Sequence, residues 1–197
     1  MQKPFSQACE NNKDPILQVI SEVFSRSYQV WEIGSGTGQH ACYFAKHLAH
    51  LEWQPTDRKE NIAGIALWRA EAQLANLKAP LILDVTDEDW PCRVIEALFT
   101  ANTLHIMSWV EVRIFFQRLP LYLRPGAPVC IYGPFNYHSQ YTSVSNANFD
   151  QCLKSQHALS GIRNFEDIVE LAMAVGIKLV RDIAMPANNR LLVFENS

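Results

Sequence analysis

Three glycines at every second position constrain this chain more than any other feature of its sequence. Residues 30–38 read Val-Trp-Glu-Ile-Gly-Ser-Gly-Thr-Gly, so an apolar run leads directly into Gly34, Gly36 and Gly38. The run is typical of a buried parallel strand, and the glycines are typical of a tight turn where backbone approaches a ligand. A dinucleotide-binding turn has the pattern Gly-x-Gly-x-x-Gly. Its third glycine would fall on Gln39, so the register argues against a dinucleotide site and an NAD-dependent oxidoreductase.

An acidic residue near the end of the apolar run adds information about the ligand. With Glu32 the segment reads Glu-x-Gly-x-Gly-x-Gly, which resembles motif I of the class I S-adenosylmethionine-dependent methyltransferases. The resemblance implies a cationic cofactor without phosphate, beside which a carboxylate is electrostatically favourable. The residues of this segment expected to bind S-adenosylmethionine are Glu32, Gly34, Ser35, Gly36 and Gly38.

Strand-like apolar runs alternate with helical periodicity along the chain, which is typical of a doubly wound α/β fold with a mostly parallel sheet. A hairpin signal at residues 185–189 predicts one antiparallel edge strand. The expected strands are 28–33, 51–56, 81–83, 103–107, 129–132, 177–184 and 190–195. The expected helices are 38–49, 60–77 and 165–175, a first helix that opens after Asp14-Pro15, a helix that ends near 123, and a short helix near 149–153.

Length and composition favour one ordinary domain over residues 1–197. Seventeen Lys and Arg against twenty Asp and Glu, with no cationic stripe, argue against a nucleic-acid partner. Five widely spaced cysteines predict reduced thiols in the cytoplasm and no metal site. The sequence shows no signal-peptide core or spanning segment, so we expect no membrane partner, and it does not indicate an oligomeric state.

Ligands of doubly wound sheets lie outside the carboxyl ends of the strands. The residues expected there after the second, third and fourth strands are Asp57, Asp84, Val85, Met107, Ser108 and Trp109. Asp57 follows Gly38 by 19 positions, an offset that suits a hydrogen bond to ribose hydroxyls. Asp84 is assigned to the adenine amino group, and Trp109 to stacking or solvent exclusion. A strand-end Asp taken alone is more often a turn or cap residue, and Trp109 is as typical of a core.

His40 lies in the first turn of the helix after the glycines, where the helix dipole disfavours imidazolium. It can act as a base near the transferred methyl group, or it can be a hydrogen-bonded packing residue. The catalytic candidates are His40, Tyr141 and Asn188. The substrate-side candidates are Asn12, Lys13, Phe135, Asn146 and Asn189. For the polar candidates, a hydrogen bond that stabilises a loop is an equal alternative.

Further motifs run along nearly the whole chain. They are Asn12–Leu17, Gly34–Ala41, Trp53–Asp57, Leu83–Val85, Tyr132–Phe135, Ser145-Asn146, Phe149-Asp150, Gly161–Arg163 and Met185–Asn189. Together they resemble the domain-of-unknown-function-938 family of class I methyltransferase-like proteins, whose vertebrate member is methyltransferase-like protein twenty-six. The resemblance implies a seven-stranded, Rossmann-like methyltransferase fold and S-adenosylmethionine binding, and it supplies no substrate. Residues 136–140 and 155–160 depart from the family's usual pattern, which bears on specificity.

The sequence therefore favours an S-adenosylmethionine-dependent methyltransferase acting on an unknown small molecule or protein side chain. The alternative is a catalytically silent S-adenosylmethionine-binding module that acts through a protein partner, because the binding residues survive in both. Met107-Ser108-Trp109 also differs from the Asn/Asp-Pro-Pro-aromatic motif of nucleic-acid amino methyltransferases. The loops around Asn12-Lys13, 133–150 and 186–189 are expected to converge near the methyl group.

Overall fold

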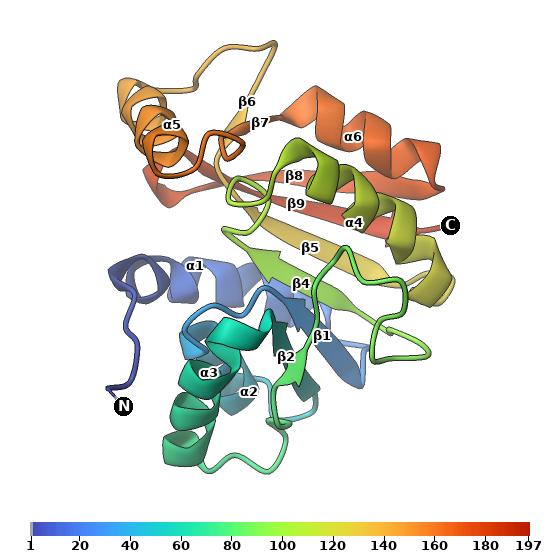
Figure 1. Ribbon diagram of the computed structural model, residues 1–197. Coiled ribbons are helices and arrows are strands. Elements are labelled where there is room, and N and C mark those ends of the chain that lie inside the picture. The colour runs from blue at the N-terminus through green and yellow to red at the C-terminus, as the bar shows by residue number, and fades with distance from the viewer. Residues whose placement is uncertain (1) are drawn as a thin grey trace. The chain divides into compact units, whose positions relative to one another are not determined.

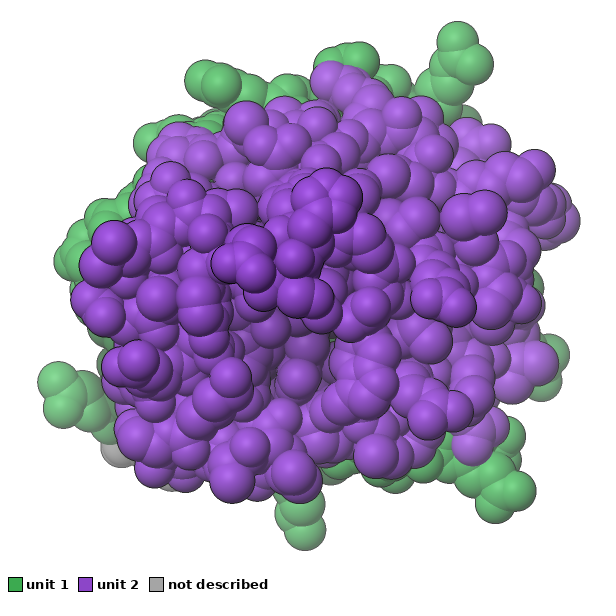
Figure 2. All heavy atoms as spheres, turned by 90° about the horizontal axis from the view of Figure 1, so that it is seen from above, with its two compact units in different colours: residues 1–100 green, residues 101–197 purple. Residues whose placement is uncertain are grey.

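The computed structural model of the protein describes residues 2–197. The chain divides into two compact units, residues 1–100 and 101–197, which Figure 2 shows in different colours. The helices and strands of both units carry the labels of Figure 1. Among residues 2–197, no helix combines the length and the apolar character needed to cross a membrane.

The first unit is built on four parallel strands in the order β3-β2-β1-β4. The strands are β1 (Gln29–Ile33), β2 (Glu52–Asp57), β3 (Leu81–Ile82) and β4 (Leu98–Ala101), and the last residue of β4 opens the second unit. The helices are α1 (Gln7–Val23), α2 (Gln39–His47) and α3 (Lys59–Ala72). Helix α2 packs against β2, α1 and α3, and α3 also packs against β2.

An aromatic cluster explains how α2 is held against the sheet of the first unit. Phe44 from α2, Trp53 from β2 and Phe99 from β4 are all fully buried. Their ring centroids lie 5.3 to 5.8 Å apart in tilted and edge-to-face arrangements, which are favourable for aromatic pairs. The cluster therefore holds α2, the helix that follows the glycine turn, against β2 and β4.

The second unit contains three strands in the order β5-β9-β8, and β9 runs antiparallel to both neighbours. They are β5 (Pro128–Gly133), β8 (Ile177–Met185) and β9 (Asn189–Asn196), with the 3-10 helix η1 (Pro186–Asn188) between β8 and β9. A separate parallel pair is formed by β6 (Phe135–Asn136) and β7 (Arg163–Asn164). The helices are α4 (Trp109–Tyr122), α5 (Val144–Gln156) and α6 (Phe165–Ala174), and α6 packs against β8 and α4.

The predicted α/β fold with a mostly parallel sheet is confirmed, but the predicted antiparallel edge strand is wrong in its position. The antiparallel strand β9 lies between β5 and β8. Residues Leu191, Leu192, Val193 and Phe194 are all buried, which is the pattern of an internal strand, whereas most of β8 is partly or fully exposed. The hairpin signal correctly predicted that β8 and β9 pair, but it carried no information on which of the two strands is internal.

The fourth strand also differs from the prediction. It covers Leu98–Ala101, while residues 104–106 form a turn in place of the strand expected at 103–107. Both segments are short apolar runs, which periodicity alone cannot separate. Asn102 with φ +58° ends the strand, and asparagine tolerates this left-handed conformation better than most residues.

The first helix begins earlier than expected, at Gln7, because Ser6 caps it by accepting a hydrogen bond from the backbone N–H of Cys9. Pro15, expected at the helix start, lies inside α1. Helix α5 is also longer than the short helix expected near 149–153, because Ser143 caps it at its N-terminus.

Candidate cofactor and substrate site

The glycine turn between β1 and α2 is held open by backbone conformations that favour glycine. Gly34, Gly36 and Gly38 have φ angles of +74°, +57° and +88°. The backbone N–H groups of Gly34 and Ser35 both donate to the carbonyl of Thr56 at 3.0 Å, which ties the turn to the end of β2. The turn is therefore a fixed structure at the carboxyl end of β1.

The last two glycines of the turn have different reasons to lack a side chain. A Cβ at Gly36 would meet no heavy atom within 4 Å, and Gly36 is exposed, so this part of the turn has open space beside it. A Cβ at Gly38 would lie 3.0 Å from Cα of Ile65, so Gly38 allows α2 to approach α3 closely. Gly36 is thus the glycine suited to a ligand's approach, and Gly38 serves helix packing.

The carboxylate of Asp57 fixes an acidic centre beside Gly36. Its Oδ2 accepts a 2.6 Å hydrogen bond from the backbone N–H of Gly36. Its Oδ1 accepts from the backbone N–H of Arg58 at 2.7 Å and from Nδ2 of Asn61 at 2.9 Å. A carboxylate offers about four acceptor positions, so one remains on Oδ2 after these three bonds. Asp57 can therefore hold the turn and still accept from a ligand hydroxyl.

Glu32 lies in the interior at the end of β1. It is 1% exposed, and its Oε2 accepts a 2.9 Å hydrogen bond from Nε1 of Trp53. Burial raises the pKa of Glu32 to about 7, despite the hydrogen bonds from Trp53 and Ser35, and the negative charge of Asp57 raises it further. The residue is an acidic group whose ionised form is favoured by a nearby cation.

Asp84 and Val85 follow β3 in a local turn. Oδ1 of Asp84 accepts from the backbone N–H and the hydroxyl of Thr86 at 2.9 and 2.7 Å, and its own N–H donates to Asp87 at 3.2 Å. Val85 is buried. This is the turn arrangement that the sequence offered as the alternative, and it leaves Oδ2 of Asp84 without a hydrogen bond among the described residues.

The structure brings together two candidates that lie 28 positions apart, His40 and Asn12. His40 is buried, and its Nε2 lies 2.7 Å from Oδ1 of Asn12, so Nε2 donates to the amide oxygen. The ring stacks on Phe44 at a centroid distance of 5.2 Å. Burial lowers the pKa of His40 to about 4, which keeps the ring neutral near pH 7. The neighbouring candidate Lys13 pairs with Glu10 on the same helix.

In the second unit, Met107, Ser108 and Trp109 lie at the start of α4 and not directly after a strand. Ser108 and Glu111 form a capping box, in which Oγ of Ser108 accepts from the backbone N–H of Glu111 at 3.2 Å. Arg163 donates to the carbonyl of Met107, and its guanidinium lies 5.9 Å from the ring centre of Trp109. Asn102 is the residue that directly follows β4. The sequence analysis expected the fourth strand at 103–107 and so did not consider Asn102.

Tyr141 is anchored on a buried carboxylate that the sequence reasoning did not single out. Its hydroxyl donates to Oδ2 of Asp150 at 2.7 Å, and Lys154 donates to the same oxygen at 2.5 Å. Oδ1 of Asp150 accepts from the backbone N–H of Ile162 at 2.6 Å. Burial by itself raises the pKa of Asp150, but these hydrogen bonds outweigh it and hold the pKa below its usual value.

Two other segments of the second unit meet around Asn146. Nδ2 of Asn146 donates to the carbonyl of Asn188 at 3.2 Å and to the hydroxyl of Thr142 at 2.9 Å. Asn188 has a φ of +58°, and Nδ2 of Asn189 donates to the carbonyl of Pro186 at 3.2 Å. Part of 133–150 and the segment 186–189 therefore lie together, as expected. Their convergence with Asn12 and Lys13 stays a prediction.

Phe135, the remaining substrate-side candidate, lies in β6 and is 1% exposed. It pairs with Arg163 of β7 in the two-stranded sheet. Its position makes it part of the framework of the second unit.

A comparison with protein families decides what kind of chain this is. The model of the family described as "Protein of unknown function (DUF938)" matches residues 3–196, almost the entire sequence. The chain belongs to the DUF938 family.

Solved structures similar to this DUF938 chain have the methyltransferase fold. An O-methyltransferase family protein from Burkholderia thailandensis is 16% identical with a TM-score of 0.83, over 94% of this chain and 56% of that one. The S-adenosylmethionine-dependent methyltransferase SibL is 18% identical with a TM-score of 0.80, over 95% and 55%. An O-methyltransferase family 2 protein from Planctomyces limnophilus, in complex with apigenin, is 14% identical with a TM-score of 0.82, over 95% and 58%. The chain spans a little over half the length of these proteins.

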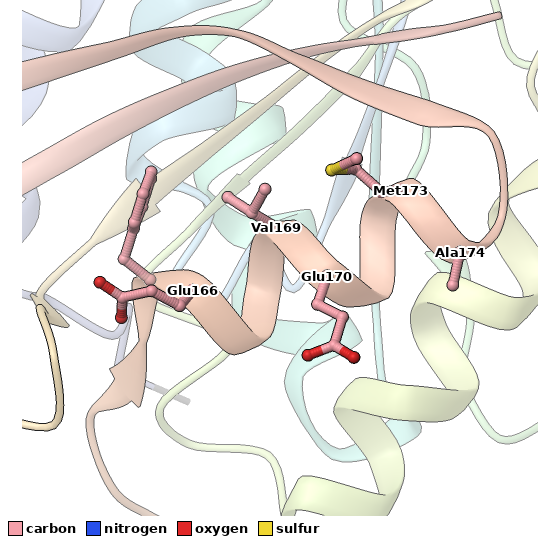
Figure 3. A pocket seen from close by; sticks show the side chains of 6 residues that line it. Glu166, Val169, Glu170, Met173 and Ala174 are labelled. Atoms are coloured by element: carbon pink, nitrogen blue, oxygen red, sulfur yellow. The ribbon is translucent and has the colours of Figure 1, made fainter.

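The lining of a hollow on the surface of the DUF938 chain includes none of the candidate residues. The hollow is lined by side chains of α6, namely Phe165, Glu166, Val169, Glu170, Met173 and Ala174, and Figure 3 shows five of them labelled. None of them was expected at the cofactor or the substrate.

Among residues 2–197, no group of three or more His, Cys, Asp or Glu side chains is placed to hold a metal ion.

Asp150 also explains a glycine in one of the DUF938-like motifs. A Cβ at Gly161 would lie 2.9 Å from Oδ1 of Asp150 and 3.1 Å from Cε of Lys154. A side chain at position 161 would therefore collide with the carboxylate that binds the next residue, Ile162. The segments Phe149-Asp150 and Gly161–Arg163 thus form one structural unit, although 10 residues separate Asp150 from Gly161.

We expect Asp150→Ala to lower the free energy of unfolding by about 2 kcal/mol, because the buried N–H of Ile162 loses its acceptor and Tyr141 loses its anchor. Lys154→Met is the matched control. The side chain of Lys154 is 55% exposed, so loss of its ion pair with Asp150 should lower the free energy of unfolding by less than about 1 kcal/mol. Urea titrations at pH 7 measure both values, and equal losses in the two variants would contradict the anchoring role of Asp150.

Proposed function

We propose that this DUF938 protein is an S-adenosylmethionine-dependent methyltransferase that acts on a small molecule or a protein side chain. The observation that carries the proposal is the carboxylate of Asp57, which is held at Gly36 beside open space and keeps one acceptor position. Such a group suits the ribose hydroxyls of a nucleoside cofactor. The fold shared with solved methyltransferases supports the same function.

The chemistry of the other residues around the turn fits this cofactor. Two acidic groups, Glu32 and Asp57, favour a cation and disfavour the phosphates of a dinucleotide. Oδ2 of Asp84 can accept from an adenine amino group, and the buried Val85 offers an apolar contact. In this proposal the cofactor residues are Glu32, Gly34, Ser35, Gly36, Gly38, Asp57, Asp84, Val85, Met107, Ser108 and Trp109.

When bound, S-adenosylmethionine supplies an electrophilic methyl group attached to a sulfonium. The protein's part is to position the acceptor, exclude water and, where needed, accept a proton. The proposed catalytic residues are His40, Tyr141 and Asn188. His40 is neutral near pH 7, and because its Nε2–H is committed to Asn12, only Nδ1 can serve as a base.

The proposed acceptor is an organic molecule of modest size and no nucleic acid. The acidic balance of the chain disfavours a polyanion, and one structurally similar methyltransferase was solved with apigenin. We further propose that residues 1–197 work as one methyltransferase-like domain and that the vertebrate methyltransferase-like protein twenty-six is a relative. Five free cysteines favour a cytoplasmic location.

Calorimetric titration with S-adenosylmethionine, S-adenosylhomocysteine and NAD tests the proposal. We expect binding of both adenosyl ligands and none of NAD. Heat with NAD alone would overturn the assignment. Incubation with methyl-labelled S-adenosylmethionine and a metabolite pool then separates the enzyme from a catalytically silent binding module, because only the enzyme transfers label.

A further inference from the structure

The side-chain amide of Gln39 connects the N-terminal segment of the chain to the glycine turn. Gln39 is 3% exposed at the start of α2. Its Oε1 accepts from the backbone N–H of Ser6 at 2.5 Å and from the hydroxyl of Thr37 at 3.0 Å. Its Nε2 donates to the carbonyl of Ser6 at 3.3 Å and to the carboxylate of Glu10 at 2.8 Å. Both acceptor positions and both protons of the amide are used.

Other contacts hold the same segment, residues 3–14, which we call the N-terminal strap. Nε1 of Trp68 donates to the carbonyl of Pro4 at 2.7 Å, and Nζ of Lys3 lies 3.8 Å from the centre of the Trp68 ring. A Cβ at Gly64 would lie 2.7 Å from Cγ of Pro4, so α3 lacks a side chain where the strap crosses it. The strap is thus seated on α3 near one end and on Gln39 and His40 farther along.

Thr37 links this arrangement to the cofactor residues. It lies between Gly36 and Gly38, and its hydroxyl both donates to Oε1 of Gln39 and accepts from the backbone N–H of Gln39 at 3.4 Å. The buried amide of Gln39 therefore connects the seating of the strap to the glycine turn. Leucine or methionine cannot make these bonds, and glutamate would place a second carboxylate against Glu10.

We propose that Gln39 is a positioning residue that couples the N-terminal strap to cofactor occupancy of the glycine turn. The inference rests on the proposed function, because it assigns a partner element to the same cofactor site. A cofactor that orders the turn also stabilises the seated strap, and the seated strap raises cofactor affinity by the same factor, since linkage is reciprocal. Gln39 stands where a dinucleotide-binding turn would have its third glycine. In this chain the residue at that position binds the strap.

Hydrogen–deuterium exchange of residues 5–14 and calorimetry with S-adenosylhomocysteine test the coupling on the full chain. In the wild type, the ligand should slow exchange of these amides about fivefold or more. In Gln39→Met we expect about tenfold weaker binding and no ligand-dependent slowing. The matched control is Gln7→Met, which removes an exposed side-chain amide at the start of α1, within the strap, that among the described residues bonds only to Asn11. It should behave as the wild type.

The ligand-dependent difference in exchange separates coupling from simple stabilisation. A residue that only stabilised the fold would change exchange equally with and without ligand. If Gln39→Met fails to fold, Glu10→Ala, which removes one of the four hydrogen bonds of the Gln39 amide, should weaken binding about threefold and reduce the slowing.

The inference alone would be overturned if the ligand slowed exchange in Gln39→Met and in Glu10→Ala as much as it does in the wild type. A wild type that binds no adenosyl ligand would overturn the proposed function, and the inference with it.

Discussion

Asp57→Ala is expected to weaken binding of S-adenosylhomocysteine by about 100-fold. The substitution removes an acceptor for ligand hydroxyls and the carboxylate that holds the backbone N–H of Gly36 at 2.6 Å. Hydrogen bonds to a charged group contribute about 1.5–3 kcal/mol each, and 2.8 kcal/mol corresponds to about 100-fold in affinity. Calorimetric titration at pH 7 gives the dissociation constants.

Glu52→Ala provides the control for this experiment, because Glu52 is the acidic residue at the opposite end of the same strand. Its side chain is 41% exposed and pairs with Lys78. Its removal should change affinity less than about twofold, since exposed ion pairs contribute little. Similar losses in the two variants would show that the general charge of β2, and not the placement of Asp57, governs binding.

As pH rises from 4.5 to 8, the free energy of unfolding of the wild type is expected to fall by about 3 kcal/mol more than that of Glu32→Gln. The folded-state pKa of Glu32 is raised from 4.5 to about 7, chiefly by burial. Between these pH values the folded state keeps a proton that the unfolded state has released, so the free energy of unfolding falls as pH rises. The contribution is fully present below pH 4.5 and lost above pH 7, and each pKa unit corresponds to about 1.4 kcal/mol.

Urea titrations at a series of pH values measure the effect as the difference between wild type and Glu32→Gln, in which the other titrating groups cancel. Glutamine keeps an oxygen that can accept from Nε1 of Trp53, so the buried hydrogen bond is retained. Parallel stability curves for the two proteins would mean that Glu32 is ionised at low pH despite its burial.

Much of the local geometry of the proposed cofactor site could be predicted from local sequence. The turn of Gly34, Gly36 and Gly38 follows an apolar strand, and Asp57 ends the next one, so their common edge follows from parallel pairing. The prediction failed for the fourth strand because two short apolar runs are equivalent without knowledge of which one pairs with β1. Because of that error, Met107–Trp109 were expected directly after a strand, and Asn102, which does follow one, was not considered.

The sequence by itself determined the parallel α/β pattern, the glycine register and the acidic strand ends, because each depends on neighbouring residues and on backbone periodicity. Tertiary structure alone decided that β9 lies between β5 and β8, that His40 donates to Asn12, and that Asp150 binds Ile162. The four hydrogen bonds of Gln39 belong to this second class. A hydrogen bond between distant segments depends on which of many similar polar groups the folded chain brings within about 3 Å, and periodicity carries no information about that choice.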